Sequence, residues 1–472
     1  MTARASWLGM VATTLLLSAC ASVERPPAPS SVALPNAFAL LDRAAVAKST
    51  GSELSRLLPA DDPAFAALSA RAVQDAPDLA VAVARIDAAR AGLRGARAAR
   101  RPDISASGGA SRERISAAQF GGLPPAIQIQ QYRSNFNAAI DATWDFDLFG
   151  RLRASQRASA ARLDAATADA AAVRLALLTD MATAVVDYRD IERRTVLIDT
   201  DAASAKTLAA ITGVRARAGV VPGFDQVRAE SLAAQAQSRR ESIDGERAAI
   251  LGRLVTLTGT STDTILAALA TPTTAAAVTE MPTLEIPSVL LRRRPDVAAA
   301  ERRLAAADAE IAAAAAERYP NISLQAGLGL VALAFGDLFS SDAVIGSLGG
   351  SIAGPLLDFG RIGARIDQRE AEAREAFANY RKTLFTALGE TEAALGALSS
   401  AAGNARVLAQ QADLDRDAAT LARERYQRGL ANFLTVLDAE RTSYASRQAV
   451  VSANAEVARQ RIAVYRAAGG GE

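Results

Sequence analysis

The sequence predicts a mainly α-helical chain with a membrane β-barrel segment, built as an internal duplication. Three observations lead to this fold class. Short motifs recur at a fixed distance along the chain, two segments alternate polar and apolar residues as strands do, and residues 151–212 contain neither glycine nor proline. Each half is therefore expected to contain two strands followed by two long helices.

The first twenty residues predict export and attachment to lipid. Arg4 precedes an apolar run over residues 7–17, which is too short to cross a bilayer of roughly 30 Å and is typical of a signal peptide. The run ends in Leu-Ser-Ala-Cys, which looks like the site where bacterial lipoproteins are cleaved and acylated. We expect residues 1–19 to be the signal peptide, Cys20 to be the lipidated N-terminus, and residues 20–65 to be a lipid-linked segment.

The composition argues against an enzyme and against nucleic-acid binding. The chain has 53 Lys and Arg against 51 Asp and Glu, and the arginines are spread along it, so no basic face is expected. It has no histidine, which removes histidine-based catalysis and metal ligation, and its three lysines lie outside any glycine-rich phosphate loop. Cys20 is the only cysteine, so internal disulfides are excluded. We expect no cofactor and no metal.

The duplication is visible in two sets of paired motifs. Residues 77–80 (PDLA) recur as 295–298 (PDVA), and residues 101–105 (RPDIS) recur as 319–323 (YPNIS), both at a distance of 218. Further on, residues 149–152 (FGRL) recur as 359–362 (FGRI) at a distance of 210. The change of eight falls between the two sets, where the first half has a longer loop. Each half is expected to begin with a helix, at 77–100 or 295–318, that ends at a proline.

The segments between these motifs have the pattern of barrel strands. In residues 132–147 the apolar side chains of Tyr132, Phe136, Ile140 and Trp144 share one face, while the other face is rich in Arg, Asn and Asp. Residues 322–330 alternate in the same way. A half-buried strand of a soluble sheet is the alternative, but an aromatic end and about a dozen residues fit a strand between lipid and water. Four strands cannot close a barrel, so several chains are expected to assemble.

The helices are predicted to be long and to pack as coiled coils. The stretch 151–212 corresponds to roughly 90 Å of helix. Apolar residues recur along it at spacings of three and four, and the second half repeats the pattern between residues 377 and 398. A seven-residue repeat of this kind indicates left-handed packing of neighbouring helices. The members are Leu163, Ala166, Ala170, Val173, Leu177, Met181, Ala184, Tyr188, Ile191, Thr195 and Ile198, then Phe377, Tyr380, Leu384, Ala387, Thr391, Ala394 and Leu398.

In this order, behind a lipoprotein motif, these features resemble the TolC-like outer membrane factors, especially the lipoprotein branch that serves resistance-nodulation-division pumps. The resemblance covers residues 20–471. It is carried by the following segments: 286–296 (IPSVLLRRRPD), 144–151 (WDFDLFGR), 354–361 (GPLLDFGR), 426–429 (YQRG) and 433–441 (FLTVLDAER).

The resemblance implies a homotrimer. Three chains would each give four strands to a twelve-stranded barrel in the outer membrane and two helical hairpins to a periplasmic coiled-coil tunnel. The implied partners are outer membrane lipid, a periplasmic adaptor and an inner membrane pump. It also implies boundaries that depend on the duplication: a first repeat at 66–260, a connector at 261–294, a second repeat at 295–468 and a flexible tail at 469–472.

The resemblance also places a periplasmic gate at the end of the last hairpin. Its residues would be Leu434 as an apolar ring, Asp438 as an acidic ring, and Arg441 one turn on as the partner of Asp438. Three copies of Asp438 around an axis would repel one another and attract cations. Some relatives have a second Asp where this chain has Thr435, and a tip Arg where this chain has Ala431. Without the resemblance, Asp438 would be a surface charge paired with Arg441 by spacing alone.

At the tip of the first hairpin, Asp225 and Glu230 are expected to be solvated charges, and Gly219 and Gly429 to provide turns. Residues 256–284, rich in Thr, Ala and Pro, are expected to form a loose connection.

Three functions follow. The first is a passive efflux duct for drugs or other small molecules, the second is the duct of a type I protein secretion system, and the third is a structural outer membrane lipoprotein with coiled-coil arms. A structural spacer would need neither barrel strands nor a tip motif.

Overall fold

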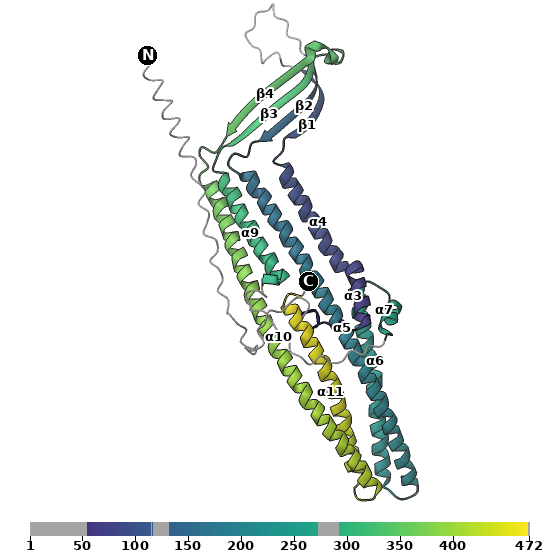
Figure 1. Cartoon of the computed structure of the whole chain (residues 1–472). Helices are drawn as coiled ribbons and strands as arrows, with labels where there is room; N and C mark the ends of the chain where they lie inside the picture. The colour runs from purple at the N-terminus through teal and green to yellow at the C-terminus, as the bar shows by residue number, and fades with distance from the viewer. Residues whose placement is uncertain (1–53, 115, 117–131, 272–291, 471–472) are drawn as a thin grey trace, which may run out of the picture. The chain divides into compact units, whose positions relative to one another are not determined.

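The computed structural model describes residues 54–114, 116, 132–271 and 292–470 (Figure 1). The helices and strands follow the predicted order in both halves. They are α3 (Pro63–Asp75), α4 (Pro77–Ala98), β1 (Asp103–Arg114), β2 (Tyr132–Asp145), α5 (Arg151–Arg217), α6 (Gly223–Thr258), α7 (Thr262–Leu269), α9 (Pro295–Ala316), β3 (Asn321–Ala332), β4 (Val344–Ala353), α10 (Arg361–Gln427) and α11 (Phe433–Ala467), with short 3-10 helices η4 (Phe335–Phe339) and η5 (Ser341–Ala343) before β4.

The chain forms two compact units, and each unit takes residues from both halves of the duplication. The described residues of the first unit lie in Asp87–Ala165 and Glu301–Asn379. Those of the second lie in Val32–Ile86, Ala166–Ala300 and Tyr380–Glu472. The duplication is therefore not a pair of separate domains, because both repeats contribute to the sheet and both contribute to the helical hairpins.

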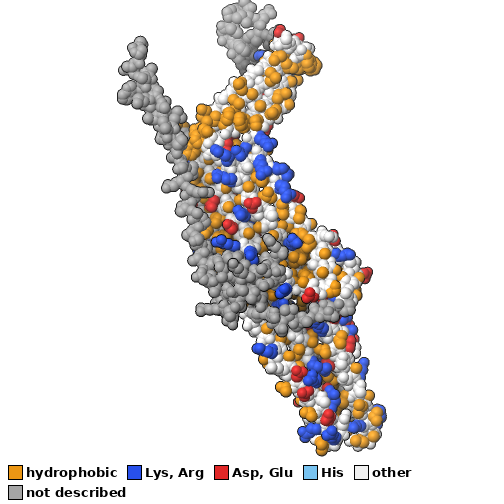
Figure 2. Space-filling view, in the orientation of Figure 1, with side chains coloured by type: hydrophobic (Ala, Val, Ile, Leu, Met, Phe, Trp, Pro, Cys, Tyr) orange, Lys and Arg blue, Asp and Glu red, His pale blue; other side chains and the backbone are white. Residues whose placement is uncertain are grey.

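The first unit contains one antiparallel sheet in the order β1-β2-β3-β4, and its two faces differ as predicted (Figure 1). On one face, Ile140 of β2 lies opposite Ala106 and Leu328, and Trp144 lies opposite Leu324. On the other face, Asp141 lies opposite Ser105 and Gly327. Figure 2 shows charged side chains gathered over the helices, whereas hydrophobic side chains are spread over the visible face of the sheet.

The repeated Phe-Gly-Arg motifs mark the two places where a strand leads into a long helix. Before α5, the Asp147 carboxylate accepts hydrogen bonds from the N–H groups of Leu152 at 2.8 Å and Arg153 at 2.9 Å. Before α10, the Asp358 carboxylate accepts one from the N–H of Ile362 at 2.9 Å. A carboxylate at this position satisfies N–H groups that the first turn of a helix leaves free.

The second unit packs α5, α6, α10 and α11 around buried side chains that include the predicted coiled-coil positions. Leu177, Met181, Ala184, Tyr188 and Ile198 of α5 are buried. The predicted coiled-coil positions of α10 between Leu384 and Leu398 are buried as well, and Thr391 among them is fully enclosed. The seven-residue repeat therefore predicted the packing faces of both long helices correctly.

A buried arginine holds the short helices of the second unit to α5. The Arg189 guanidinium contacts both Asp62 oxygens, with Nε to Oδ2 at 3.0 Å, and donates to the carbonyls of Leu269 at 2.9 Å and Thr271 at 2.8 Å. Asp62 also accepts from the N–H of Ala64 and so caps α3. One guanidinium thus joins α3, α5 and the end of α7.

Two expectations need correction. The segment 256–284 is not simply a loose connection, because α6 continues to Thr258 and α7 buries Ile265 and Leu269 in the helical core. The described part of the expected tail is also ordered: Gly470 donates its N–H to the Tyr465 carbonyl at 3.0 Å.

None of the helices within the described residues has the length and apolar character needed to cross a membrane.

Candidate functional site at the helical tip

The two hairpins end in turns of nearly identical geometry. Gly219 has a φ of 73° and Gly429 a φ of 74°. Beyond each glycine, an N–H returns to the helix: Val220 donates to the Arg215 carbonyl at 2.9 Å, and Leu430 donates to the Arg425 carbonyl at 2.8 Å. This arrangement closes a helix with a left-handed residue, which favours glycine. The expected role of both glycines as turn residues is confirmed.

The start of α11 is fixed by a cap and by one buried aromatic ring. The Asn432 side chain accepts a hydrogen bond from the N–H of Thr435 at 2.9 Å. Phe433, only 2% exposed, packs with Leu437 against Leu232 of α6. The hairpins α5–α6 and α10–α11 lie side by side here, with their turns at the same end (Figure 1). The buried face sets the rotation of α11 about its axis.

That rotation brings the three predicted gate residues together on one exposed face of α11. Leu434 is 51% exposed, and Asp438 and Arg441 are exposed as well. Their spacing of four and then three places them along one side of a helix. We call Leu434, Asp438 and Arg441 the tip face.

The tip face borders two shallow depressions. One lies between α6 and α11, where Arg228 and Gln235 join all three tip-face residues. The other lies between α10 and α11, where Asp415 and Thr442 join Leu434 and Asp438. Leu434 and Asp438 therefore form a ridge that is accessible from both sides.

Arg441 has a different partner from the one expected. Its Nη2 donates to Oε1 of Gln235 on α6 at 3.3 Å. Within the described residues of the single chain, no ion pair joins Arg441 to Asp438. Arg441 therefore links the two hairpins, and the Asp438 carboxylate remains available to groups outside the chain.

A polar cluster braces the helices behind the tip face, and sequence reasoning did not identify it. Glu440, buried on α11, pairs with Arg423 of α10, and Arg447 of α11 pairs with Asp201 of α5 at 2.6 Å. Burial raises the pKa of the Asp201 carboxyl to about 6, and this effect outweighs the attraction of Arg447 and Arg239. Asp201 follows Ile198 at the spacing of the predicted coiled-coil positions, so a charged residue at an apolar position was the available signal.

At the tip of the first hairpin, Glu230 fits the expectation of a solvated charge, whereas Asp225 is half-buried. Glu230 is exposed and accepts a hydrogen bond from the Gln226 amide at 2.9 Å. Asp225 lies in the first turn of α6. Close by, Phe224 is exposed, and the guanidinium of Arg228 lies over its ring at 4.4 Å. Neither carboxylate lines the depressions at the tip face.

Cys20, the predicted lipidation site, lies outside the described residues. Within them, no group of Cys, Asp and Glu side chains is arranged to hold a metal ion.

Comparison with known proteins places the whole architecture among outer membrane proteins. The family model described as outer membrane efflux protein matches residues 68–260 and 286–470. The pyoverdine export outer membrane protein OpmQ of Pseudomonas aeruginosa is 29% identical, over 98% of this chain and 96% of its own length. The outer membrane protein OprJ of the same organism is 30% identical, over 82% and 80%. Among solved structures, the outer-membrane channel OprN aligns with a TM-score of 0.82 and 29% identity, over 95% of this chain and 98% of its own.

Proposed function

Because this chain belongs to the outer membrane efflux protein family, we propose that it is the passive exit duct of a tripartite efflux system. The chain is an outer membrane component of an efflux system. In the proposed arrangement, a periplasmic adaptor and an inner membrane transporter deliver the cargo, and the duct performs no chemical step. Because the related OpmQ is a pyoverdine export protein, we favour a small molecule over a secreted protein as the cargo.

The two-faced sheet carries this proposal. One chain supplies four strands with an apolar face and a polar face, as a strand between lipid and water requires. Within the part of the chain that the structure describes, the two outer strands have unpaired backbone edges, which hydrocarbon does not tolerate. Three chains with four strands each would close a twelve-stranded barrel, and their hairpins would continue it as a helical tunnel in the periplasm.

The tip face supports a gate at the far end of the tunnel. In a threefold assembly, three copies of Leu434 would narrow the water path, and three copies of Asp438 would place negative charge beside it. Asp438 has no cationic partner within the described residues of its own chain, so its charge is free to act on passing ions. The link from Arg441 to Gln235 would hold α11 against α6 in the closed state.

Lipidation at Cys20 is the remaining part of the proposal, and it would add a second attachment to the outer membrane. The barrel would carry insertion, and the acyl chains would anchor the N-terminus.

Two measurements test the proposed duct. Detergent-extracted protein should have the native mass of a trimer, and the purified trimer should conduct ions across a planar bilayer without any energy source. A protein that remains monomeric in detergent would overturn the closed barrel. A trimer that conducts no ions at any voltage would favour a structural lipoprotein instead.

A further inference from the structure

Among the described residues, the outer strands β1 and β4 each pair on one side only and present a free edge on the other. In the single chain, every residue of β1 and of β4 is exposed, whereas most residues of β2 are partly covered by their neighbours. An edge of unpaired N–H and C=O groups is ready to accept another strand. The internal duplication indicates which strand each free edge accepts. Within the chain, β2 of the first repeat pairs with β3 of the second, and this pairing is a template for the contact between two chains.

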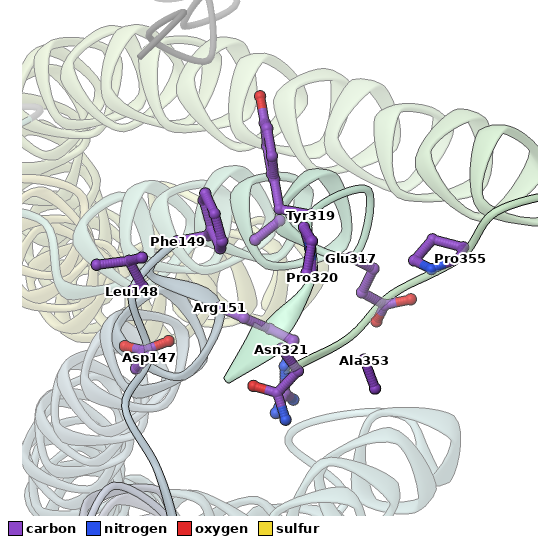
Figure 3. A pocket seen from close by; sticks show the side chains of 11 residues that line it. Asp147, Leu148, Phe149, Arg151, Glu317, Tyr319, Pro320, Asn321, Ala353 and Pro355 are labelled. Atoms are coloured by element: carbon purple, nitrogen blue, oxygen red, sulfur yellow. The ribbon is translucent and has the colours of Figure 1, made fainter. Parts of the chain in front are cut away.

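The junction between the repeats shows what such a contact looks like (Figure 3). Phe149, after β2, stacks on Tyr319, before β3, with ring centroids 4.8 Å apart and planes at 10°. Next to them, the N–H of Phe146 donates to the Ile322 carbonyl at 3.0 Å. Both rings are half-buried, and Pro320 lines the same pocket. Aromatic stacking and backbone pairing therefore act together at this junction.

The equivalent residue of the second repeat has no such cover. Phe359 lies 210 positions after Phe149 in the matching motif, and it is 97% exposed with a φ of 50°. A bulky residue rarely adopts a positive φ, and a fully exposed ring gains nothing from it. Leu356, three residues earlier, is 95% exposed. Within the described residues, Phe359 contacts no other ring.

We propose that Phe359 packs on Arg101 and Pro102 of a second copy of this chain. Tyr319 and Pro320, which cover Phe149, lie 218 positions after Arg101 and Pro102, so the duplication maps one pair onto the other. An arginine can lie over the ring face as a tyrosine does, with an added cation–π attraction. Arg101 is exposed and pairs with no carboxylate of the described chain. This inference rests on the proposed trimeric duct and identifies the residues that join its subunits.

The same mapping fixes the register between β4 and the β1 strand of the second copy. Within the chain, Thr143 of β2 lies opposite Gln325 of β3. Moving 210 positions forward from Thr143 gives Ala353, and moving 218 back from Gln325 gives Ser107. Ala353 is therefore opposite the second copy's Ser107.

The faces of the sheet agree with this register independently. It places Leu348 of β4 opposite Arg112 and Ile352 opposite Gly108. All four residues belong to the face that carries Ile140 and Trp144. A slip of one residue would turn every side chain of one strand to the wrong face. The register that the duplication dictates thus joins the face that carries Ile140 and Trp144 to the same face of the neighbouring subunit.

Disulfide cross-linking tests the register directly. In a Cys20→Ser background, the double variant Ser107→Cys, Ala353→Cys should form disulfides between subunits, seen as dimer and trimer bands on non-reducing gels. The pair Ser111→Cys, Ala353→Cys is the matched control, because it is four residues out of register, roughly 13 Å along the strand. The pair Thr143→Cys, Gln325→Cys should form its disulfide within one chain.

The outcomes separate this inference from the proposed duct. If the protein is a trimer but the control pair cross-links and the Ser107 pair does not, the proposed interface is wrong and the proposed duct still stands. A protein that stays monomeric would overturn both.

Phe359→Ala should lower the temperature at which the trimer dissociates in detergent, while Phe359→Tyr should retain it. Phe149→Ala, the same change inside the chain, should lower the unfolding temperature of the subunit itself. If the Phe359→Ala trimer dissociates at the same temperature as the wild-type trimer, the Phe359 ring does not lie in the interface.

Discussion

Asp201 of α5 and Arg447 of α11 form an ion pair of 2.6 Å although 246 residues separate them in the sequence. Asp201 is only 2% exposed, and one of its carboxylate oxygens, Oδ2, has no hydrogen-bond partner among the described residues. Glu440 lies near enough to oppose the ionisation of Asp201. The first hairpin is therefore held to the second, behind the tip face, by a carboxylate whose charge is costly to bury.

The pH dependence of stability should reveal this carboxylate. Below its ordinary pKa of 3.8 the group is neutral in the folded and the unfolded chain. Between 3.8 and about 6 the unfolded chain loses the proton while the folded chain keeps it, so the free energy of unfolding falls as the pH rises. The loss is complete above about 6 and amounts to about 3 kcal/mol.

Asp201→Asn removes this titration. The thermal midpoint of the wild-type protein should fall relative to that of the variant between pH 4 and pH 7. Asp199→Asn is the matched control, because Asp199 is exposed and bound to Arg240. Wild type and Asp201→Asn with parallel pH profiles would show that Asp201 does not keep its proton in this range.

The buried Arg189 should matter far more to stability than an exposed arginine. Arg189→Met leaves Asp62 buried without its partner and frees two carbonyls, which should cost about 3–5 kcal/mol. Arg416→Met, which removes an exposed pair with Asp413, should cost less than about 1 kcal/mol. Chemical denaturation of both variants measures the difference. Adding Asp62→Asn to Arg189→Met should recover part of the loss, and equal losses in the two single variants would contradict the proposed role.

Local periodicity was enough to predict the sheet and the long helices, because the pattern of apolar residues within each element determines which of its faces is buried. The alternation around Ile140 and the repeat through Tyr188 both depend on which face is buried. The helix α7 was missed because its eight residues lie in a segment rich in Thr and Ala, and only the buried contacts of Ile265 and Leu269 hold it in place.

Long-range partners could not be predicted in this way. The spacing within α11 suggested Asp438 as the partner of Arg441. The rotation of α11, which the buried Phe433 sets, instead brings Arg441 to Gln235 of α6. The pairing of Asp201 with Arg447 likewise depends on how two hairpins pack, which no single helix encodes.

Acylation should be detectable on the mature protein. We expect mass spectrometry of protein extracted from outer membranes to show an N-terminus at Cys20 that carries lipid. Cys20→Ser should lose the acyl groups and still form trimers, because the barrel supplies the membrane contact. An unmodified N-terminus in the wild-type protein would remove the lipoprotein assignment, and loss of all membrane association in Cys20→Ser would count against the barrel.

The tip face should control both the size and the charge preference of the conducting path. Because Asp438 has no cationic partner within the described chain, three copies near the axis should attract cations, and the closed duct should show a small, cation-preferring conductance. Asp438→Asn should weaken the cation preference with little change in conductance, since the side chain keeps its size. Leu434→Ala should enlarge the conductance and leave the cation preference in place.

Arg441→Ala and Gln235→Ala should each loosen the contact between α6 and α11 and raise the open probability of the channel. Asp413→Asn, an exposed acidic position on α10, serves as the control and should change neither property. Recordings from single channels in planar bilayers measure all three quantities. If conductance and selectivity stay unchanged when Asp438→Asn and Leu434→Ala are combined, the constriction lies elsewhere, and Asp225 at the tip of the first hairpin becomes the next residue to replace.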